Sequence, residues 1–420
     1  MSAIQPKGGR AGLLKALTFM MFTMFAMTTD SVGVIIPQVI RQFGLGMTAA
    51  GSFQYATMAG ISIAAIGLGF LADRFGRKAT IIAGLAVFGL SCLLFGVGRG
   101  FPTFVVLLFL GGLGIGVFKS GALALIGDLS TSTRQHTATM NLLEGFFGVG
   151  AIIGPALVAS LLRWGAGWQW LYVIASAICA VLIAGAAFAR YPAAPPAARD
   201  GGHAGEMLGV IRDPYALGFS VAAMLYVGTE AAVYVWAPTY LTGYQGPLIW
   251  LATYAVSVFF VLRALGRFLG AQMLSRFHWS AVLLVATVGV LGCFLAASMF
   301  GRGVGAVALP LSGVFMSVIY PTLNSKGISG FEKARHGGAA GVILFFTCVS
   351  AVLSPLAMAA LSDRMGDAKY SLYLASVMAA LLAAMALFNV LARPTAARLA
   401  AREAEDYGPG DGAAPGVVEA

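Results

Sequence analysis

Charged residues are scarce in this sequence. Asp, Glu, Lys and Arg together make up 10% of the 420 residues, whereas soluble domains average about 25%. Hydrophobic residues make up 59%, so the chain has too few polar side chains to cover an exterior that faces water. The composition therefore excludes an ordinary soluble protein and favours one whose exterior faces lipid.

Cysteine and histidine are also rare, with four residues of each. All four cysteines lie inside apolar runs, without the spacing of a zinc site or a disulfide framework. The sequence has no phosphate-binding loop and no nucleophile-and-base motif. We therefore expect no metal, no cofactor and no enzymatic activity. The net charge of +10 comes from basic residues at predicted helix ends rather than from one patch, so nucleic acid is not an expected partner.

Long apolar runs occupy most of the chain, and about 20 apolar residues suffice to cross a bilayer as a helix. Short polar breaks divide these runs into twelve predicted spans, at residues 14–38, 49–72, 79–98, 102–127, 138–162, 167–189, 214–240, 247–275, 279–300, 304–327, 337–361 and 370–392. The Pro-, Ala- and Gly-rich segment 190–213 is predicted to be a linker, and the polar tail 393–420 to be disordered. We expect an all-α membrane protein whose twelve helices form two six-helix bundles, 14–189 and 214–392, after an N-terminal segment 1–13.

The two predicted bundles share short sequence patterns at an offset of about 200 residues. Gly116-Val117-Phe118 in the fourth span recurs as Gly313-Val314-Phe315 in the tenth. Thr29-Asp30 in the first span parallels Thr229-Glu230 in the seventh. The common order and offset predict two pseudo-symmetric repeats, and transporters built from repeats bind their solute between them, near the middle of the bilayer.

Basic residues are distributed unevenly between the two sides of the predicted bundles. If the N-terminus is cytoplasmic, the inside segments hold 17 of the 26 Lys and Arg residues and the outside segments hold six; Lys119, Arg263 and Arg267 fall within spans. The positive-inside rule then predicts that both termini are cytoplasmic. The basic start of the chain imitates a signal peptide, but the apolar run continues to Ile40 without a clear cleavage site, so we expect an uncleaved first helix.

The loop between the second and third spans carries the most specific motif. It reads Gly69-Phe70-Leu71-Ala72-Asp73-Arg74-Phe75-Gly76-Arg77-Lys78 and resembles the signature loop of the major facilitator superfamily. Gly69 is expected to allow close helix approach and Gly76 a tight turn. The resemblance assigns this loop, with Asp73, Arg74 and Arg77, to a cytoplasmic gate. Arg267, which follows Gly266 near the end of the eighth span, is interpreted as part of the same gate.

Three further segments resemble the fucose:proton symporter family within that superfamily. They are Leu225–Glu230 with Trp236 in the seventh span, Asn141–Gly148 in the fifth and Met316–Leu323 in the tenth. The resemblance implies transport of a sugar with protons, Asp30 as a coupling acid, and Tyr226 and Trp236 as aromatic contacts of the solute. Lys119 departs from the family, because the corresponding position there is an acid.

Ionisable side chains inside a membrane span are unfavourable and are therefore functional candidates. The candidates for solute or proton binding are Asp30, Lys119, Glu144, Glu230 and Arg263, with Asn324 near the end of the tenth span. Each has a structural alternative. Lys119 could pair with Asp30 or Glu144, and Glu144 and Glu230 could join the two bundles.

We therefore expect a secondary transporter that works by alternating access and takes up a small polar solute, a sugar or a sugar-like organic acid, with protons. Lys119 leaves the charge of the solute open. The alternative is a proton-coupled exporter of an organic or amphipathic compound, because Gly150-Ala151-Ile152-Ile153-Gly154-Pro155 resembles a helix motif of drug:proton antiporters. The expected partners are the solute, protons and the lipid of a cell inner membrane. The chain is expected to cross this membrane several times and to be a monomer.

Overall fold

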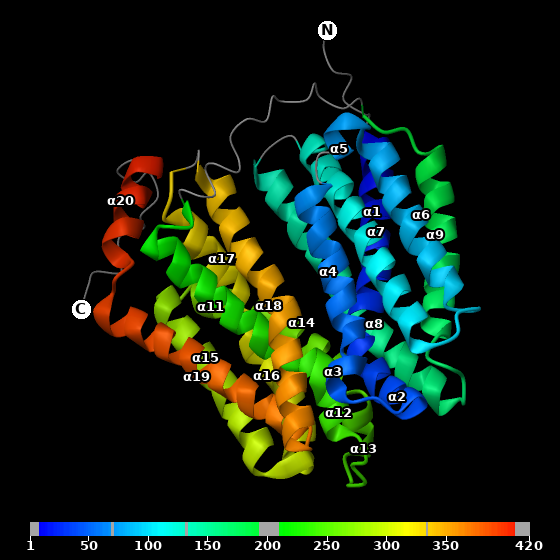
Figure 1. Ribbon diagram of the computed structural model, residues 1–420. Helices are drawn as coiled ribbons and strands as arrows, with labels where there is room; N and C mark the ends of the chain where they lie inside the picture. Colours follow the sequence, from blue (N-terminus) through cyan, green and yellow to red (C-terminus); the bar gives the residue numbers. More distant parts are fainter. Residues whose placement is uncertain (1–7, 69–70, 131–132, 193–209, 333–334, 408–420) are drawn as a thin grey trace.

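The computed structural model describes residues 8–68, 71–130, 133–192, 210–332 and 335–407 (Figure 1). The first bundle consists of α1 (Gly8–Thr29), α2 (Val32–Phe43), α3 (Met47–Ala50), α4 (Ser52–Gly67), α5 (Leu71–Arg74), α6 (Arg77–Leu94), α7 (Phe101–Asp128), α8 (Thr133–Arg163) and α9 (Trp170–Phe188). The second consists of α11 (Pro214–Ala231), the π-helix η1 (Ala232–Trp236), α12 (Ala237–Leu241), α13 (Ile249–Thr253), α14 (Ala255–Leu274), α15 (Trp279–Met299), α16 (Gly301–Met316), α17 (Ile319–Ser329), α18 (His336–Met365) and α19 (Lys369–Ala392), followed by α20 (Ala396–Tyr407).

Eleven helical segments in the described ranges are long and apolar enough to cross a membrane. The remaining predicted span, 49–72, is occupied by α4, whose 16 residues cover about 24 Å. The short helices α3 and α5 lie on either side of α4 in the chain, and residues 69–70 between α4 and α5 are outside the described ranges. The architecture agrees with the predicted all-α fold of twelve transmembrane helices.

The first, seventh and tenth spans, predicted as continuous helices, are each interrupted. The first breaks at Asp30 and Ser31, between α1 and α2, where the Ser31 hydroxyl donates a 2.6 Å hydrogen bond to the Met27 carbonyl. Such bonds from Ser to the preceding turn bend helices. In the seventh and tenth spans, Pro238 and Pro321 lack the N–H that would bond the fourth residue before them, and the irregular segment η1 and the break before α17 lie at that point.

Glycines let the helices of the first bundle approach backbone to backbone. A Cβ atom on Gly60 of α4 would lie 2.3 Å from the Phe109 carbonyl oxygen of α7, and one on Gly84 of α6 would lie 2.5 Å from the Phe118 nitrogen. Gly112 of α7 packs equally closely on Thr57 of α4. Close packing of this kind is how helices associate in lipid, where no hydrophobic force drives them together. It accounts for part of the sequence's 55 glycines.

The two bundles meet at the end of the molecule away from the N-terminus. There α2 packs against η1 and α12, α3 and α4 pack against α18, and α8 packs against α14. Figure 1 shows the first bundle, in blue to green, and the second, in green to red, leaning together at that end and diverging toward the end that carries α5, α17 and α20. The contact between the two bundles is therefore concentrated at one end of the molecule.

The C-terminal tail departs from the prediction. Residues 393–420 were predicted to be disordered, but Ala396–Tyr407 forms the helix α20. Its physical anchor is Arg398, whose guanidinium makes two 2.9 Å hydrogen bonds with the Asp213 carboxylate and a 2.7 Å bond to the Gly330 carbonyl. At the other terminus α1 begins at Gly8, inside the segment 1–13 that was predicted to precede the first span. Most of the predicted linker, residues 193–209, lies outside the described ranges.

Candidate functional site

Two acids lie at matching irregularities of the two bundles. Asp30 is in the break between α1 and α2, and Glu230 is in the last turn of α11, directly before η1. Both positions are near the middle of their spans, where the helix backbone is interrupted. The structure thus places the pair that the repeat comparison matched in equivalent settings. Asp30 is half-buried and accepts a 3.1 Å hydrogen bond from the Thr29 hydroxyl.

Glu230 forms an ion pair with Arg263 of α14. The side chains retain 10% and 20% exposure, so both charges are largely withdrawn from water and each depends on the other for compensation. Both partners belong to the second bundle. Glu230 therefore does not join the two bundles here, which was its structural alternative.

Lys119 of α7 has no ion pair among the described residues. Its ammonium lies 5.6 Å from the centroid of the Phe147 ring of α8. The acids near enough to act on its charge are Glu144 first and Asp30 second, but neither carboxylate is in ion-pair contact. Lys119 is therefore held by a cation–π contact and by the field of two acids, in a conformation that leaves its ammonium without a bonded anion.

Arg263, Arg267 and Glu144 line a cavity of about 150 Å³ between α8 and α14. Glu144 is exposed, and Arg263 and Arg267 are half-buried. The Nε atoms of both arginines are buried without a hydrogen-bond partner in the described part of the chain. Since buried donors normally find an acceptor, these two are free to bind an acceptor that enters between the bundles.

The charges at the centre of the protein balance. Asp30, Glu144 and Glu230 carry three negative charges when ionised, and Lys119, Arg263 and Arg267 carry three positive ones. The charges influence one another across the bundles, because Arg263, Glu230 and Lys119 all act on Asp30. The six charges cancel, so a bound anion would leave one negative charge, which a single bound proton would remove.

The other predicted contacts are placed differently. The hydroxyl of Tyr226, which is fully buried, donates a 3.2 Å hydrogen bond to the Met316 carbonyl. Trp236 is equally buried, and its indole N–H donates a 3.2 Å bond to the Pro355 carbonyl. In this conformation both side chains support the second bundle, and their contact with a solute stays a prediction. Asn324 is half-buried in α17.

The signature loop is described in part. Gly76 has a φ of 84° and precedes α6, which confirms the tight turn. Arg77 is buried and donates 2.9 Å hydrogen bonds to the Asp128 carboxylate and to the Ala72 carbonyl. Arg74 is exposed. Gly69 and the side chain of Asp73 lie outside the described part of the structure, so the gating role of this loop stays a prediction.

Sequence reasoning missed a contact on the opposite side of the membrane. The carboxylate of Asp363, in the last turn of α18, accepts 2.7 Å hydrogen bonds from the backbone N–H groups of Met47 and Thr48 at the start of α3. A signal for it exists in the sequence. The motif Leu71-Ala72-Asp73-Arg74-Phe75-Gly76 recurs as Leu361-Ser362-Asp363-Arg364-Met365-Gly366, and Gly366 has a φ of 75°.

Further hydrogen bonds join the bundles at or near the same end. The Tyr55 hydroxyl donates to the Pro355 carbonyl at 3.3 Å, Arg163 donates to the Tyr254 hydroxyl at 3.2 Å, and Ser257 donates to the Ile152 carbonyl at 2.9 Å. The bundles are thus closed on the side away from the termini. With both termini predicted to be cytoplasmic, this is the conformation that faces inward.

Comparison with known proteins agrees with this architecture. The family model of the Major Facilitator Superfamily matches residues 17–355. The L-fucose-proton symporter of Escherichia coli (strain K12) is 24% identical over 385 residues, which are 84% of this chain and 87% of that protein. The 4-hydroxybenzoate transporter PcaK of Pseudomonas putida is 28% identical over 158 residues, covering 38% of this chain and 35% of that protein.

Among solved structures, a bacterial homologue of the human lysosomal transporter Spinster, in an inward-facing and unoccupied conformation, has the same fold. It superimposes with a TM-score of 0.69 at 15% identity and covers 97% of this chain and 100% of that chain. The family model spans most of the sequence, and the helices, the two bundles and the signature loop agree with it. The chain belongs to the Major Facilitator Superfamily and is a multi-pass membrane transporter, not an enzyme.

Proposed function

We propose that this protein takes up a small polar solute, a sugar-like organic acid, together with protons across a bacterial inner membrane by alternating access. The single observation that carries the proposal is the central cluster of Asp30, Lys119, Glu144, Glu230, Arg263 and Arg267, in which the Lys119 ammonium has no bonded anion among the described residues. A merely structural network would be expected to pair its charges.

The charge of the cluster supports proton coupling. The six ionised side chains cancel, so an anionic solute alone would leave one uncompensated negative charge, and desolvation of an isolated ion is unfavourable. Binding of one proton together with the solute restores neutrality, so the loaded protein can close over it. Asp30 is the better candidate for the proton, since its described bond comes from a hydroxyl, whereas Glu230 is engaged by Arg263.

The charge of the solute is inferred from unpaired donors. Lys119 has an aromatic ring rather than a carboxylate beside it, and the Nε atoms of Arg263 and Arg267 lack acceptors among the described residues. A carboxylate on the solute would satisfy such donors through charge-assisted hydrogen bonds. Relatives named for a sugar, L-fucose, and for an organic acid, 4-hydroxybenzoate, are compatible with a solute that has features of both.

Transport into proteoliposomes tests the proposal. With the outside more acidic, a sugar acid such as glucuronate should accumulate, and a protonophore should abolish the accumulation. The neutral sugars glucose and fucose serve as the comparison in the same vesicles. Accumulation of the neutral sugars alone would overturn the anionic solute, and uptake that ignores the proton gradient would overturn the coupling.

Export of an organic or amphipathic compound is the second candidate, and one observation favours it. A Cβ atom on Gly150 or Gly154 of α8 would lie 2.0 Å from a carbonyl oxygen of α1, at Thr23 and Met27 respectively. The antiporter-like glycine motif therefore packs α8 directly against α1. The direction of proton-driven flux in the same vesicles separates export from uptake.

A further inference from the structure

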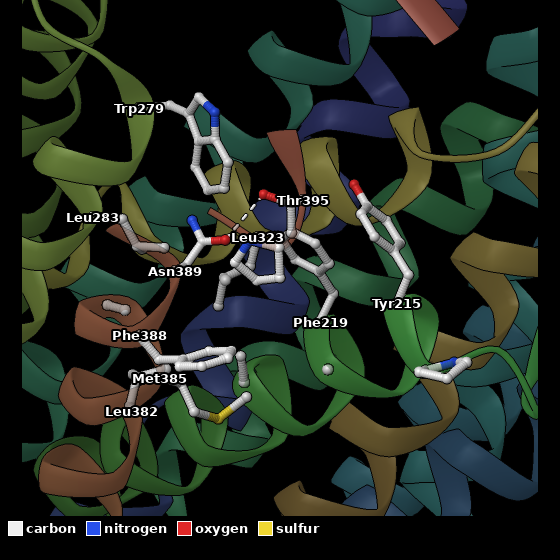
Figure 2. A pocket seen from close by; sticks show the side chains of 15 residues that line it. Tyr215, Phe219, Trp279, Leu283, Leu323, Leu382, Met385, Phe388, Asn389 and Thr395 are labelled. Carbon is white, nitrogen blue, oxygen red and sulfur yellow. Dashed lines mark hydrogen bonds between the residues drawn. The ribbon is translucent and has the colours of Figure 1, made fainter. Parts of the chain in front are cut away.

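A second cavity, separate from the charged cluster, lies within the second bundle near α20. Its volume is about 350 Å³, and side chains of α11, α15, α17 and α19 line it, together with the segment that leads into α20. Figure 2 shows Trp279, Phe219, Met385 and Phe388 around this space. The hydrogen bond from Thr395 to Asn389, at 2.9 Å, lies at one side of it. The lining is predominantly apolar, so water would find few partners there.

The wall formed by the segment that leads into α20 is held by contacts of that helix. The Arg398 guanidinium is bound by the Asp213 carboxylate and lies over two aromatic rings, at 4.6 Å from the centroid of Tyr215 and 4.4 Å from that of Phe331. These contacts hold the start of α20 against the N-terminal end of α11. The pocket is therefore a built feature of the second bundle rather than a gap beside a loose tail.

The surroundings of this pocket are basic. Five Lys or Arg residues lie within three positions of a lining residue, against the single acid Asp213, which Arg398 already neutralises; the five are Arg212, Arg276, Lys326, Arg393 and Arg398. The Lys326 ammonium lies 5.9 Å from the ring of Trp279, which lines the pocket. Arg393 directly precedes Pro394, another lining residue, and is exposed.

An apolar cavity with a basic edge, set among membrane helices, matches an amphipathic anion. We propose that this pocket holds one acyl chain of an anionic phospholipid, whose phosphate lies against Lys326 and Arg393. Phe388 lines the pocket and is 61% exposed, so the chain enters beside it from the surrounding bilayer. Basic residues near a membrane surface favour anionic lipids. The bound chain fills the space between α15 and α19 and is independent of which solute is transported.

Quenching of Trp279 by lipids with brominated acyl chains tests the proposal, on purified full-length protein in nanodiscs. The contribution of Trp279 is the difference between the native protein and Trp279→Phe. We expect brominated phosphatidylglycerol to quench this contribution more strongly than brominated phosphatidylcholine at equal mole fraction. Equal quenching by the two lipids would refute the role of the basic edge.

Two sets of variants separate the chain from the headgroup. Gly218→Leu fills the pocket, because a Cβ at this lining residue meets nothing within 4 Å, and it should abolish the anion-dependent quenching. Gly292→Leu is the matched control, at an exposed position of α15 with equally open space, and should change nothing. Lys326→Gln and Arg393→Gln leave the pocket intact and should each weaken the preference for the anionic lipid, by about fivefold. Undiminished quenching in Gly218→Leu, or an undiminished preference in both Gln variants, would overturn the proposal.

Discussion

The carboxylate of Asp363 in one bundle accepts a 2.7 Å hydrogen bond from the backbone N–H of Met47 in the other. Its second oxygen accepts an equal bond from Thr48. Both donors are N–H groups at the start of a helix, which have no partner within the helix and attract negative charge. The contact therefore works as a latch between the bundles, on the side where they are closed. The motif around Asp363 repeats that of the signature loop, so the same local sequence occurs on both faces of the protein.

Removal of this latch should shift the protein toward the conformation in which the end that is now closed opens. Asp363→Asn keeps the shape but loses the charge, and we expect the closed state to lose about 1.5 kcal/mol, roughly tenfold in the ratio of the two states. Spin labels at Thr103→Cys and Arg302→Cys, both at exposed positions next to the closed end, would report a larger long-distance population. The background for these labels lacks the four native cysteines.

Asp367 provides the control for this shift. It lies four residues further on, in the loop between α18 and α19, but its described partners, Lys369 and the Lys369 backbone, belong to its own bundle. Asp367→Asn should leave the distance distribution unchanged. Identical distributions in Asp363→Asn and the native protein would show that the contact does not set the balance between the two conformations.

The orientation of the chain gives the latch its direction. The distribution of Lys and Arg predicts that both termini are cytoplasmic. Reporter fusions after Arg163 and after Pro394 should therefore report the outside and the inside, respectively. The same side for both fusions would refute the predicted topology, and exchanged sides would place the latch on the cytoplasmic face.

Substitution of Asp30 and substitution of Glu230 should have different effects on transport and on stability. Asp30→Asn should abolish proton-driven accumulation and leave counterflow exchange intact, because exchange moves no net proton. Glu230→Gln should in addition destabilise the protein, by about 3–5 kcal/mol, since it leaves Arg263 buried without its ion-pair partner. Thermal unfolding in detergent measures this difference directly.

A second substitution separates stability from coupling. Glu230→Gln combined with Arg263→Met removes both charges, and should recover most of the lost stability without restoring accumulation. Full accumulation in both Asp30→Asn and Glu230→Gln would exclude either acid as the proton carrier and would leave Glu144 as the next candidate.

The contact between Arg398 and Asp213 that holds α20 should depend on pH. Burial disfavours the ionised carboxylate of Asp213, but the hydrogen bonds from Arg398 and from the Tyr215 backbone outweigh it, so the pKa of Asp213 lies below its usual value. Because the pKa of Asp213 is lower in the folded than in the unfolded chain, its ionised carboxylate stabilises the folded chain fully above the ordinary pKa of about 3.9. This stabilisation is lost as the pH falls through the lower pKa of the folded state. Proteolysis of the C-terminal helix should therefore be slow and constant between about pH 5 and pH 8. Asp213→Asn should accelerate it at every pH in that window, and unchanged cleavage in this variant would show that the pair does not hold the helix.

Apolar runs and the signature loop were sufficient to predict the twelve helices and the two bundles, because lipid leaves few alternatives to the helix. The repeat comparison also matched Asp30 with Glu230 before their positions were known. The breaks at these two acids and in the tenth span were missed. They depend on Ser31, Pro238 and Pro321, and a proline or serine within an apolar run bends some membrane helices and leaves others continuous.

Two further features depend on distant partners. The attachment of α20 requires Arg398 to meet Asp213, which is 185 residues away in the sequence, whereas the polar composition of the tail predicted disorder. The latch at Asp363 joins groups 316 residues apart, although the repeated motif around it was visible. In both cases the residue type was evident but the side chain's partner was not, since a pairing between residues far apart in the sequence leaves no local pattern.

Lys119 should decide which solutes bind. Its ammonium has no ion pair among the described residues and lies over the ring of Phe147, beside a cavity whose arginine donors lack acceptors. If an anionic solute completes this arrangement, Lys119→Gln should weaken the binding of a sugar acid by about tenfold or more, since a charge-assisted hydrogen bond contributes about 1.5–3 kcal/mol. The affinity for a neutral sugar should change little. Thermal-shift titrations with both ligands give the two affinities on the same protein. Lys15→Gln is the matched control, because Lys15 bonds Thr139 within the first bundle at 3.3 Å. An equal loss for both ligand classes would mean that Lys119 maintains the shape of the cavity, and the favoured solute would then be a neutral sugar.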